Sequence, residues 1–173
     1  MIRRLFTPWR LKYLVNPEER AVCIFCRAAE ADEDRAVWVL YRGQHAFVLL
    51  NLYPYSSGHL MIAPYRHWAS PTDAPREVLH EMADLTRETL AILHRVYRPD
   101  GFNTGMNLGR AAGAGFADHF HLHIVPRWEG DTNFMTTIGE TRLIPESIEE
   151  TYERLRPLFD ALTSVDTSNG RIE

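Results

Sequence analysis

Three histidines alternate with apolar residues in one short segment, His119-Phe120-His121-Leu122-His123-Ile124-Val125-Pro126. Side chains of a β-strand point alternately to its two faces, so the three imidazoles would share one face, about 7 Å apart. Phe120, Leu122 and Ile124 would pack on the core from the other face. Neutral imidazole is a good nucleophile at neutral pH because its pKa is about 6.5. The pattern therefore favours nucleophilic attack on phosphorus by His121, with a histidine on either side to orient it or to hold a phosphate.

Two other interpretations of this histidine row (His119, His121 and His123) stay open. A single histidine on a strand is more often a polar residue on the solvent-facing side of a sheet, although strict alternation of three is uncommon. The row could also hold a metal ion in a metal-dependent hydrolase. Imidazoles two residues apart can share a metal, but three on one straight strand rarely converge.

The loop before the histidine row consists mostly of small residues, from Gly109 to Gly115. Such a loop lets backbone N–H groups approach a phosphate closely. Alone it would equally suit a flexible hairpin connection without a ligand. Because it stands directly before His119, we interpret it as an anion-binding loop. Arg110 and Arg127 flank this region and are candidates to pair with more distant phosphates, or are simply solvated.

The chain has two cysteines, Cys23 and Cys26, with the two-residue gap of a zinc knuckle. Two thiolates need two further ligands, and histidines must supply them because there is no second cysteine pair. The alternatives are a pair of reduced, half-buried cysteines or a thioredoxin-like redox pair. The redox pair is less favoured because no βαβ pattern surrounds it.

The elements that must position these residues are predicted from hydrophobic periodicity. Strands are expected at 36–41, 45–51, 59–63, 102–108 and 119–126, the first two as a hairpin. An amphipathic helix begins near Pro75 and ends before Pro99-Asp100-Gly101, and a final helix begins at Pro145-Glu146. The order predicts an α+β fold, an antiparallel sheet of about five strands with one long helix and a C-terminal helix.

A chain of 173 residues predicts one domain. We expect residues 1–35 to form an N-terminal arm with the cysteine pair, packed on a domain at 36–163, and residues 164–173 to form a flexible tail. The basic, aromatic residues Trp9, Arg10 and Tyr13 of the arm would lie over the active site, make a dimer contact, or pack on the core.

Composition excludes several classes of protein. The 19 Lys and Arg against 23 Asp and Glu give a net charge of −4, which argues against a broad basic surface for a nucleic-acid polymer. A polyanionic ligand would have to be held by a few donors in one pocket. No apolar stretch approaches the ~18–20 residues of a membrane span. The paired arginines near the start are not followed by an apolar segment, so we expect a cytoplasmic protein.

From about residue 22 to about residue 128 the chain resembles the histidine triad (HIT) superfamily of nucleotide hydrolases and transferases. The histidine row matches the superfamily signature, and residues 51–64 look like its earlier strand–turn–strand block. Within the superfamily, three segments resemble the diadenosine tetraphosphate phosphorylase branch and its bacterial relatives. They are Thr7-Pro8-Trp9-Arg10, residues 103–109, and residues 125–134.

The resemblance implies a HIT-like fold and a catalytic set of His121, His123 and His119. His121 would attack the α-phosphorus and become transiently nucleotidylated, while His123 would contact the phosphate or the leaving group. Asn51 matches the residue that binds the ribose hydroxyls. The residues implied in nucleotide binding are Asn51, His59, Asn107, Gly113, Gly115, Phe116 and His123. No divalent ion is obviously required for this chemistry, and no organic cofactor is expected.

Resemblance to zinc-containing HIT relatives and galactose-1-phosphate uridylyltransferases implies a structural zinc site made of Cys23, Cys26, His67 and His119. HIT proteins resemble one another in forming homodimers, so a homodimer is expected here as well.

The chain departs from many hydrolases of the superfamily, which have Gln and then Ser or Thr where this chain has Gly115 and Phe116. The change removes a hydroxyl donor and leaves room for an acceptor other than water. The resemblance to the phosphorylase branch implies cleavage of a dinucleoside polyphosphate, and the missing hydroxyl favours phosphorolysis by inorganic phosphate over hydrolysis. The alternatives are a nucleoside phosphoramidate or mononucleotide hydrolase, and a non-catalytic, zinc-stabilised nucleotide-binding protein that interacts with partners.

Overall fold

The computed structural model of the chain describes residues 22–131 and 146–166. Its five strands are β1 (Val39–Arg42), β2 (Ala46–Leu50), β3 (Leu60–Pro64), β4 (Gly101–Gly105) and β5 (Leu122–Arg127). They form one antiparallel sheet in the order β1-β2-β3-β5-β4. The α-helices are α2 (Ile24–Glu30), α3 (Arg76–Tyr97) and α5 (Ile148–Asp166). The predicted α+β class, the five antiparallel strands, the long helix and the C-terminal helix are confirmed.

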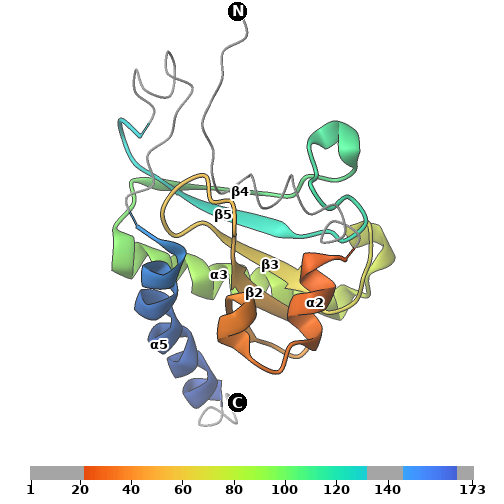
Figure 1. Ribbon diagram of the computed structural model, residues 1–173, viewed down its shortest axis with the longest axis horizontal. Helices are drawn as coiled ribbons and strands as arrows, with labels where there is room; N and C mark the ends of the chain where they lie inside the picture. Colours follow the sequence, from red (N-terminus) through yellow and green to blue (C-terminus); the bar gives the residue numbers. More distant parts are fainter. Residues whose placement is uncertain (1–21, 132–145, 167–173) are drawn as a thin grey trace, which may run out of the picture.

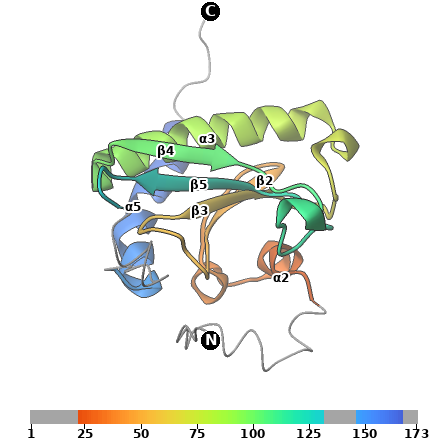
Figure 2. The ribbon, with the colours of Figure 1, turned by 90° about the horizontal axis from the view of Figure 1, so that it is seen from above.

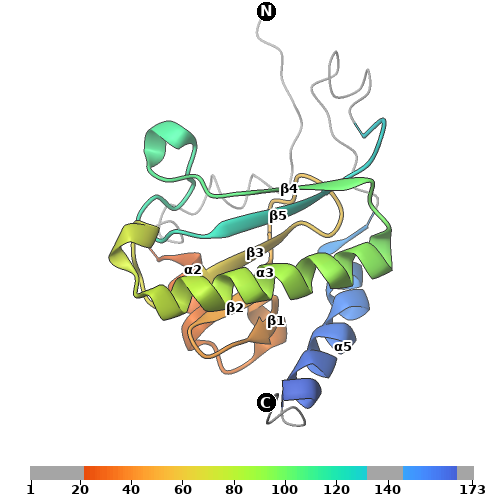
Figure 3. The same cartoon turned by 180° about the vertical axis from the view of Figure 1, so that it is seen from behind.

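Helices cover both faces of the sheet. The long helix α3 crosses one face, and α2 lies on the opposite side (Figures 1, 2 and 3). Side chains of β2 divide accordingly, since Val48 and Leu50 belong to the core beneath α3 and α5, while Phe47 and Leu49 belong to the core beneath α2. Two-sided burial explains why β2 and β3 are continuous apolar runs rather than alternating ones. None of the described helices is long and apolar enough to span a membrane.

Several element boundaries differ from the predicted ones for local reasons. The first strand begins at Val39 because residues 34–37 form a 3₁₀ turn that ends at Trp38, whose φ of 60° is left-handed. The final helix begins at Ile148, later than predicted. Ser147 Oγ accepts a hydrogen bond from the Glu150 N–H and Glu150 accepts one from the Ser147 N–H, a capping box that sets this start. The helix continues to Asp166, into the range predicted as a tail.

The strand with the histidines is also shorter than predicted. Pairing in β5 begins at Leu122, whereas His119 to His121 precede it. Phe120 still packs in the core beneath α3, and its N–H donates to the carbonyl of Trp68. The extended segment therefore keeps the predicted alternation although only its second half is paired. The N-terminal motif at Thr7 to Arg10, with Trp9 and Tyr13, lies outside the described residues, as do residues 132–134 of the later motif.

Glu81 on α3 fixes the turn between β1 and β2. Its carboxylate accepts hydrogen bonds from the backbone N–H groups of Gln44, His45 and Ala46 at 2.7, 2.5 and 2.8 Å. We expect Glu81→Ala to lower the free energy of unfolding by about 2–3 kcal/mol, because charge-assisted bonds are lost and backbone donors are left unpaired. Urea denaturation measures the change.

The matched control is Asp84→Ala, which removes an exposed carboxylate from the same helix and should change stability by less than about 0.5 kcal/mol. An effect of Glu81→Ala as small as that of the control would contradict the assigned role.

Candidate active site and metal site

The histidine row lies beneath α2 rather than on an open surface. The pattern of three alternating imidazoles would suit an open sheet surface, but His119 is 0% exposed and His121 is 5% exposed. The cover is the ring of Phe25, which stands 4.5 Å from the His121 ring and 5.2 Å from the His119 ring. The apolar side chain between the two cysteines thus closes the face on which the histidines lie.

The hydrogen bond of His121 defines which ring nitrogen is free. Nδ1 lies 2.9 Å from the carbonyl oxygen of His119, and a carbonyl only accepts, so Nδ1 carries the proton. Nε2 then has a free lone pair. Burial lowers the pKa of His121 below its usual value, although the bond to His119 partly opposes this shift. The neutral, nucleophilic form of this imidazole is therefore the stable one at neutral pH.

His123 has the opposite polarity, and a chain of hydrogen bonds sets it. The backbone N–H of Tyr55 donates to His59 Nδ1 at 3.1 Å, so the proton of neutral His59 is on Nε2. That nitrogen lies 3.0 Å from His123 Nδ1, which must then accept. Burial is the main cause that lowers the pKa of His59 to about 3 and of His123 to about 4, so both are neutral. His123 consequently keeps its proton on Nε2 as a donor, and its ring centroid lies 4.8 Å from that of His121.

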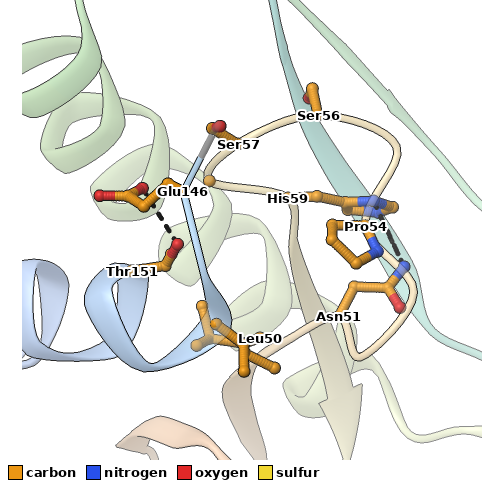
Figure 4. Close-up of a pocket in the computed structure, with 10 residues that line it drawn as sticks. Leu50, Asn51, Pro54, Ser56, Ser57, His59, Glu146 and Thr151 are labelled. Carbon is orange, nitrogen blue, oxygen red and sulfur yellow. Dashed lines mark hydrogen bonds between the residues drawn. The ribbon is translucent and has the colours of Figure 1, made fainter. Parts of the chain in front are cut away.

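His59 is held from behind by Asn51. The Asn51 amide nitrogen lies 3.3 Å from His59 Nδ1 (Figure 4). The Asn51 amide oxygen accepts a hydrogen bond from the Tyr53 N–H. Beyond them is a cavity of about 20 Å³ that Glu146 and Thr151 help to line, and their side chains are hydrogen-bonded at 3.0 Å. A cavity of this size holds about one water molecule. This side of the site is a support and not a substrate pocket.

The larger pocket, about 210 Å³, opens on the other side of the histidines. Its wall contains seven residues singled out from the sequence, namely Asn51, Asn107, Gly113, Gly115, Phe116, His121 and His123. His59 is 2% exposed and lies behind His123, and His119 points to the cysteines instead. The structure therefore brings most of the expected nucleotide-binding residues together but leaves His59 out of the pocket wall.

Five further residues line this pocket and were not expected from the sequence. They are Ile24, Phe25, Tyr53, Tyr55 and Met61. Apolar and aromatic side chains carry little positional signature, so no motif identified them. For Phe25 the sequence did contain a signal: it lies between two candidate metal ligands, so its ring must lie close to the metal site.

Cys23, Cys26, His67 and His119 form a separate cluster whose ligand atoms all lie within 4.8 Å of one another. Sulfur-to-Nδ1 distances are 3.4 Å for Cys23–His119, 3.1 Å for Cys26–His67 and 3.6 Å for Cys26–His119. Metal bonds of about 2.3 Å to sulfur and about 2.0–2.1 Å to nitrogen place these atoms about 3.5 Å apart in a tetrahedron. The four residues therefore fit one metal ion.

The second nitrogen of His119 supports the same assignment. Nε2 lies 2.9 Å from the carbonyl oxygen of Pro64, so it carries the proton and leaves Nδ1 free as a ligand. The histidine row is thus divided, with His119 in the metal cluster and the other two in the pocket. Within the described residues the cysteine–histidine cluster is the one group with suitable ligand geometry, so the interpretation of the row as a three-histidine metal site is wrong.

An α+β fold whose antiparallel sheet carries alternating histidines next to a loop of small residues defines a class, the histidine triad proteins. Residues 33–130 match the HIT domain, and the chain belongs to the HIT family. A relative from Mycobacterium tuberculosis named AP-4-A phosphorylase is 37% identical over 158 residues, which cover 87% of this chain and 80% of the relative.

Solved structures agree on the HIT-like fold. A crystal structure of a Zn-bound histidine triad family protein from Mycobacterium smegmatis superposes with a TM-score of 0.65 at 28% identity, over 84% of this chain and 99% of that one. A hypothetical histidine triad nucleotide-binding protein from Sulfolobus tokodaii gives a TM-score of 0.65 at 24% identity, covering 87% and 100% of the two chains. The predicted HIT-like fold is confirmed.

Proposed function

We propose that this protein is a nucleotidyl-transferring enzyme that cleaves a dinucleoside polyphosphate of the diadenosine tetraphosphate type at the α-phosphorus. The observation that carries the proposal is the opposite polarity of two neighbouring imidazoles in one pocket, a lone pair on His121 and an N–H on His123. A nucleophile and a donor to phosphate oxygen are the two groups that displacement at phosphorus requires. Similarity to the AP-4-A phosphorylase supports the substrate class.

The reaction proceeds in two displacements. His121 Nε2 attacks the α-phosphorus, a phosphorus–nitrogen bond forms, and the bridging phosphorus–oxygen bond breaks to release a nucleoside polyphosphate. The imidazole becomes cationic as it attacks, and its Nδ1–H bond to the His119 carbonyl strengthens with that charge. His123 Nε2–H donates to a phosphate oxygen, and backbone N–H groups at Gly115 and Phe116 stabilise the remaining charge.

The second displacement transfers the nucleotidyl group from His121 to an acceptor. We propose inorganic phosphate as the preferred acceptor, with water as the other candidate. A side chain at Gly115 would meet nothing within 4 Å, and the space beside this loop supports an acceptor larger than water. Asn51 is proposed to bind the ribose hydroxyls, with Asn107 and Phe116 next to the phosphates. His59 acts through His123 rather than on the nucleotide.

Incubation of diadenosine tetraphosphate with and without inorganic phosphate tests the acceptor. ADP and ATP formed only when phosphate is present are the expected products, and chromatography resolves them. ATP and AMP formed without phosphate would make the protein a hydrolase. Turnover of a nucleoside phosphoramidate but not of the tetraphosphate would favour the phosphoramidate hydrolase. Tight nucleotide binding without any turnover would favour a binding protein.

We propose zinc as the ion of the cysteine–histidine cluster. Two thiolates and two imidazoles whose ligand atoms lie within 4.8 Å of one another are a ligand set that suits zinc, and all four ligands come from the protein, as in structural sites. The related M. smegmatis structure is Zn-bound. Bound there, zinc supplies folding energy by joining α2 to the segment before β5, and the residues of the pocket perform the chemistry. No organic cofactor is proposed.

We also propose a cytoplasmic homodimer. Strand β4 lies at one end of the sheet order, and within the described part of the chain no strand pairs with its outer edge. Residues 103–105 of this strand are exposed, so the edge is available to a second copy. We further propose that residues 1–35 form an N-terminal arm and residues 164–173 a C-terminal tail. Both segments lie largely outside the described residues.

A further inference from the structure

One short helix contributes to both the metal cluster and the pocket. Cys23 is the N-cap of α2 and Cys26 lies in its first turn, while Ile24 and Phe25, the two residues between them, line the pocket. The metal ligands and the pocket residues are therefore neighbours in the sequence, with no residues between them. A shift of this first turn moves two metal ligands and two pocket residues together.

The ring of Phe25 touches residues of both sites. It is 0% exposed and lies 5.2 Å from the ring of the metal-cluster residue His119 and 4.5 Å from the ring of His121. It also makes a T-shaped contact with Phe116 of the loop before His119, with ring centroids 6.0 Å apart. Aromatic contacts at such distances add to area burial, so displacement of this ring changes the orientation of the rings that it packs against.

The two ends of α2 are held differently. At the C-terminal end, Arg42 donates to the carbonyl oxygens of Ala28, Ala29 and Ala31 at 2.8, 3.2 and 3.1 Å. At the N-terminal end, Cys23 caps the helix without a side-chain hydrogen bond, and the first turn contains no acidic residue. In the described part of the chain, the cysteine–histidine cluster therefore fixes the first turn to the segment before β5, together with the apolar packing of Phe25 and Ile24.

We infer that the metal cluster and the nucleotide pocket are thermodynamically linked through α2, with Phe25 as the positioning residue that connects them. Metal binding orders the first turn, which places Phe25 against His121 and completes the pocket wall. Nucleotide binding orders the same turn and so raises the affinity for metal. Linkage requires the two factors to be equal. The inference rests on the proposed function, because it takes the pocket to be a nucleotide site.

Paired affinity measurements on the whole protein test the linkage. The dissociation constant of Zn²⁺ is measured by competition with a chromophoric chelator, with and without saturating AMP, and that of AMP is measured by calorimetry on metal-loaded and metal-free protein. We expect each ligand to tighten the other by the same factor, about tenfold. Adenosine, which has no phosphate to bind free metal, should act in the same direction. Neither readout depends on turnover.

Phe25→Leu tests the route, with Phe159→Leu as its matched control. Both residues are 0% exposed. Phe159, however, belongs to α5, packs in the core on the α3 side of the sheet and lines neither site. Phe25→Leu should reduce the linkage factor to about one or two, whereas Phe159→Leu should lower stability and keep the factor of the natural protein. A full linkage factor in Phe25→Leu would overturn the role of this ring.

The outcomes separate the linkage from the proposed function. If AMP binds metal-loaded and metal-free protein equally well, the linkage is overturned and the assignment of the nucleotide pocket stands. AMP that does not bind the metal-loaded protein at all overturns the nucleotide function, and the linkage with it.

Discussion

His121→Ala should reduce turnover of diadenosine tetraphosphate by about 10⁴- to 10⁶-fold, a loss typical of removing a covalent nucleophile. The Nε2 lone pair of this residue is the one group of the pocket with both the free electrons and the position to attack. Burial already keeps the imidazole neutral, so the substitution removes a nucleophile that needs no activation. Steady-state kinetics with excess phosphate gives the ratio.

Two comparisons make this result specific. His123→Ala removes a hydrogen-bond donor and leaves the nucleophile, so a smaller loss of about 10²–10³-fold is expected. His80→Ala removes an exposed histidine of α3 and should leave turnover unchanged. His121→Ala with more than a hundredth of normal activity would contradict the covalent mechanism.

Cys26→Ser should release the metal and lower thermal stability. Loss of one of four ligands weakens metal binding, and an ion present at about 1,000 times its dissociation constant contributes about 4 kcal/mol to the folded state. For a domain of this size that corresponds to a fall in Tm of roughly 10 °C. Elemental analysis gives the metal content, and calorimetry gives the Tm.

The control for this substitution is the natural protein in chelator. Stripped of metal, the natural protein and Cys26→Ser should melt within a few degrees of each other, because serine replaces the thiol with little change in volume. The metal site would be contradicted if protein purified without chelator contained no metal and its Tm did not respond to added Zn²⁺.

Long, strongly patterned elements were predictable from the sequence. The apolar runs of β2 and β3 and the three- and four-residue periodicity of α3 depend on burial, which the sequence records directly. The helix α2 was not expected, because its seven residues are too few for a periodic signal; they include Cys26, and Cys23 is the N-cap. The left-handed Trp38 that delays β1 has no sequence signature, since a bulky residue rarely adopts that conformation.

Within the site, the sequence indicated which residues gather but not how they divide. Strand alternation correctly separated the histidines from Phe120 and Ile124, yet it could not show that α2 covers the histidine face. The family resemblance implied that His59 binds nucleotide, whereas His59 lies behind His123 and sets its protonated nitrogen. That arrangement depends on the Tyr55 N–H, a backbone group whose direction only the folded turn defines.

Direct observation of the nucleotidylated protein tests the central claim, attack by His121 on the α-phosphorus. The protein is mixed with diadenosine tetraphosphate in the absence of phosphate, quenched within one turnover, digested and examined by mass spectrometry under conditions that preserve phosphoramidate bonds. We expect one adenylyl group on His121 that disappears when phosphate is added before the quench. Rapid turnover without any protein-bound adenylyl group, or an adenylyl group on a residue other than His121, would contradict it.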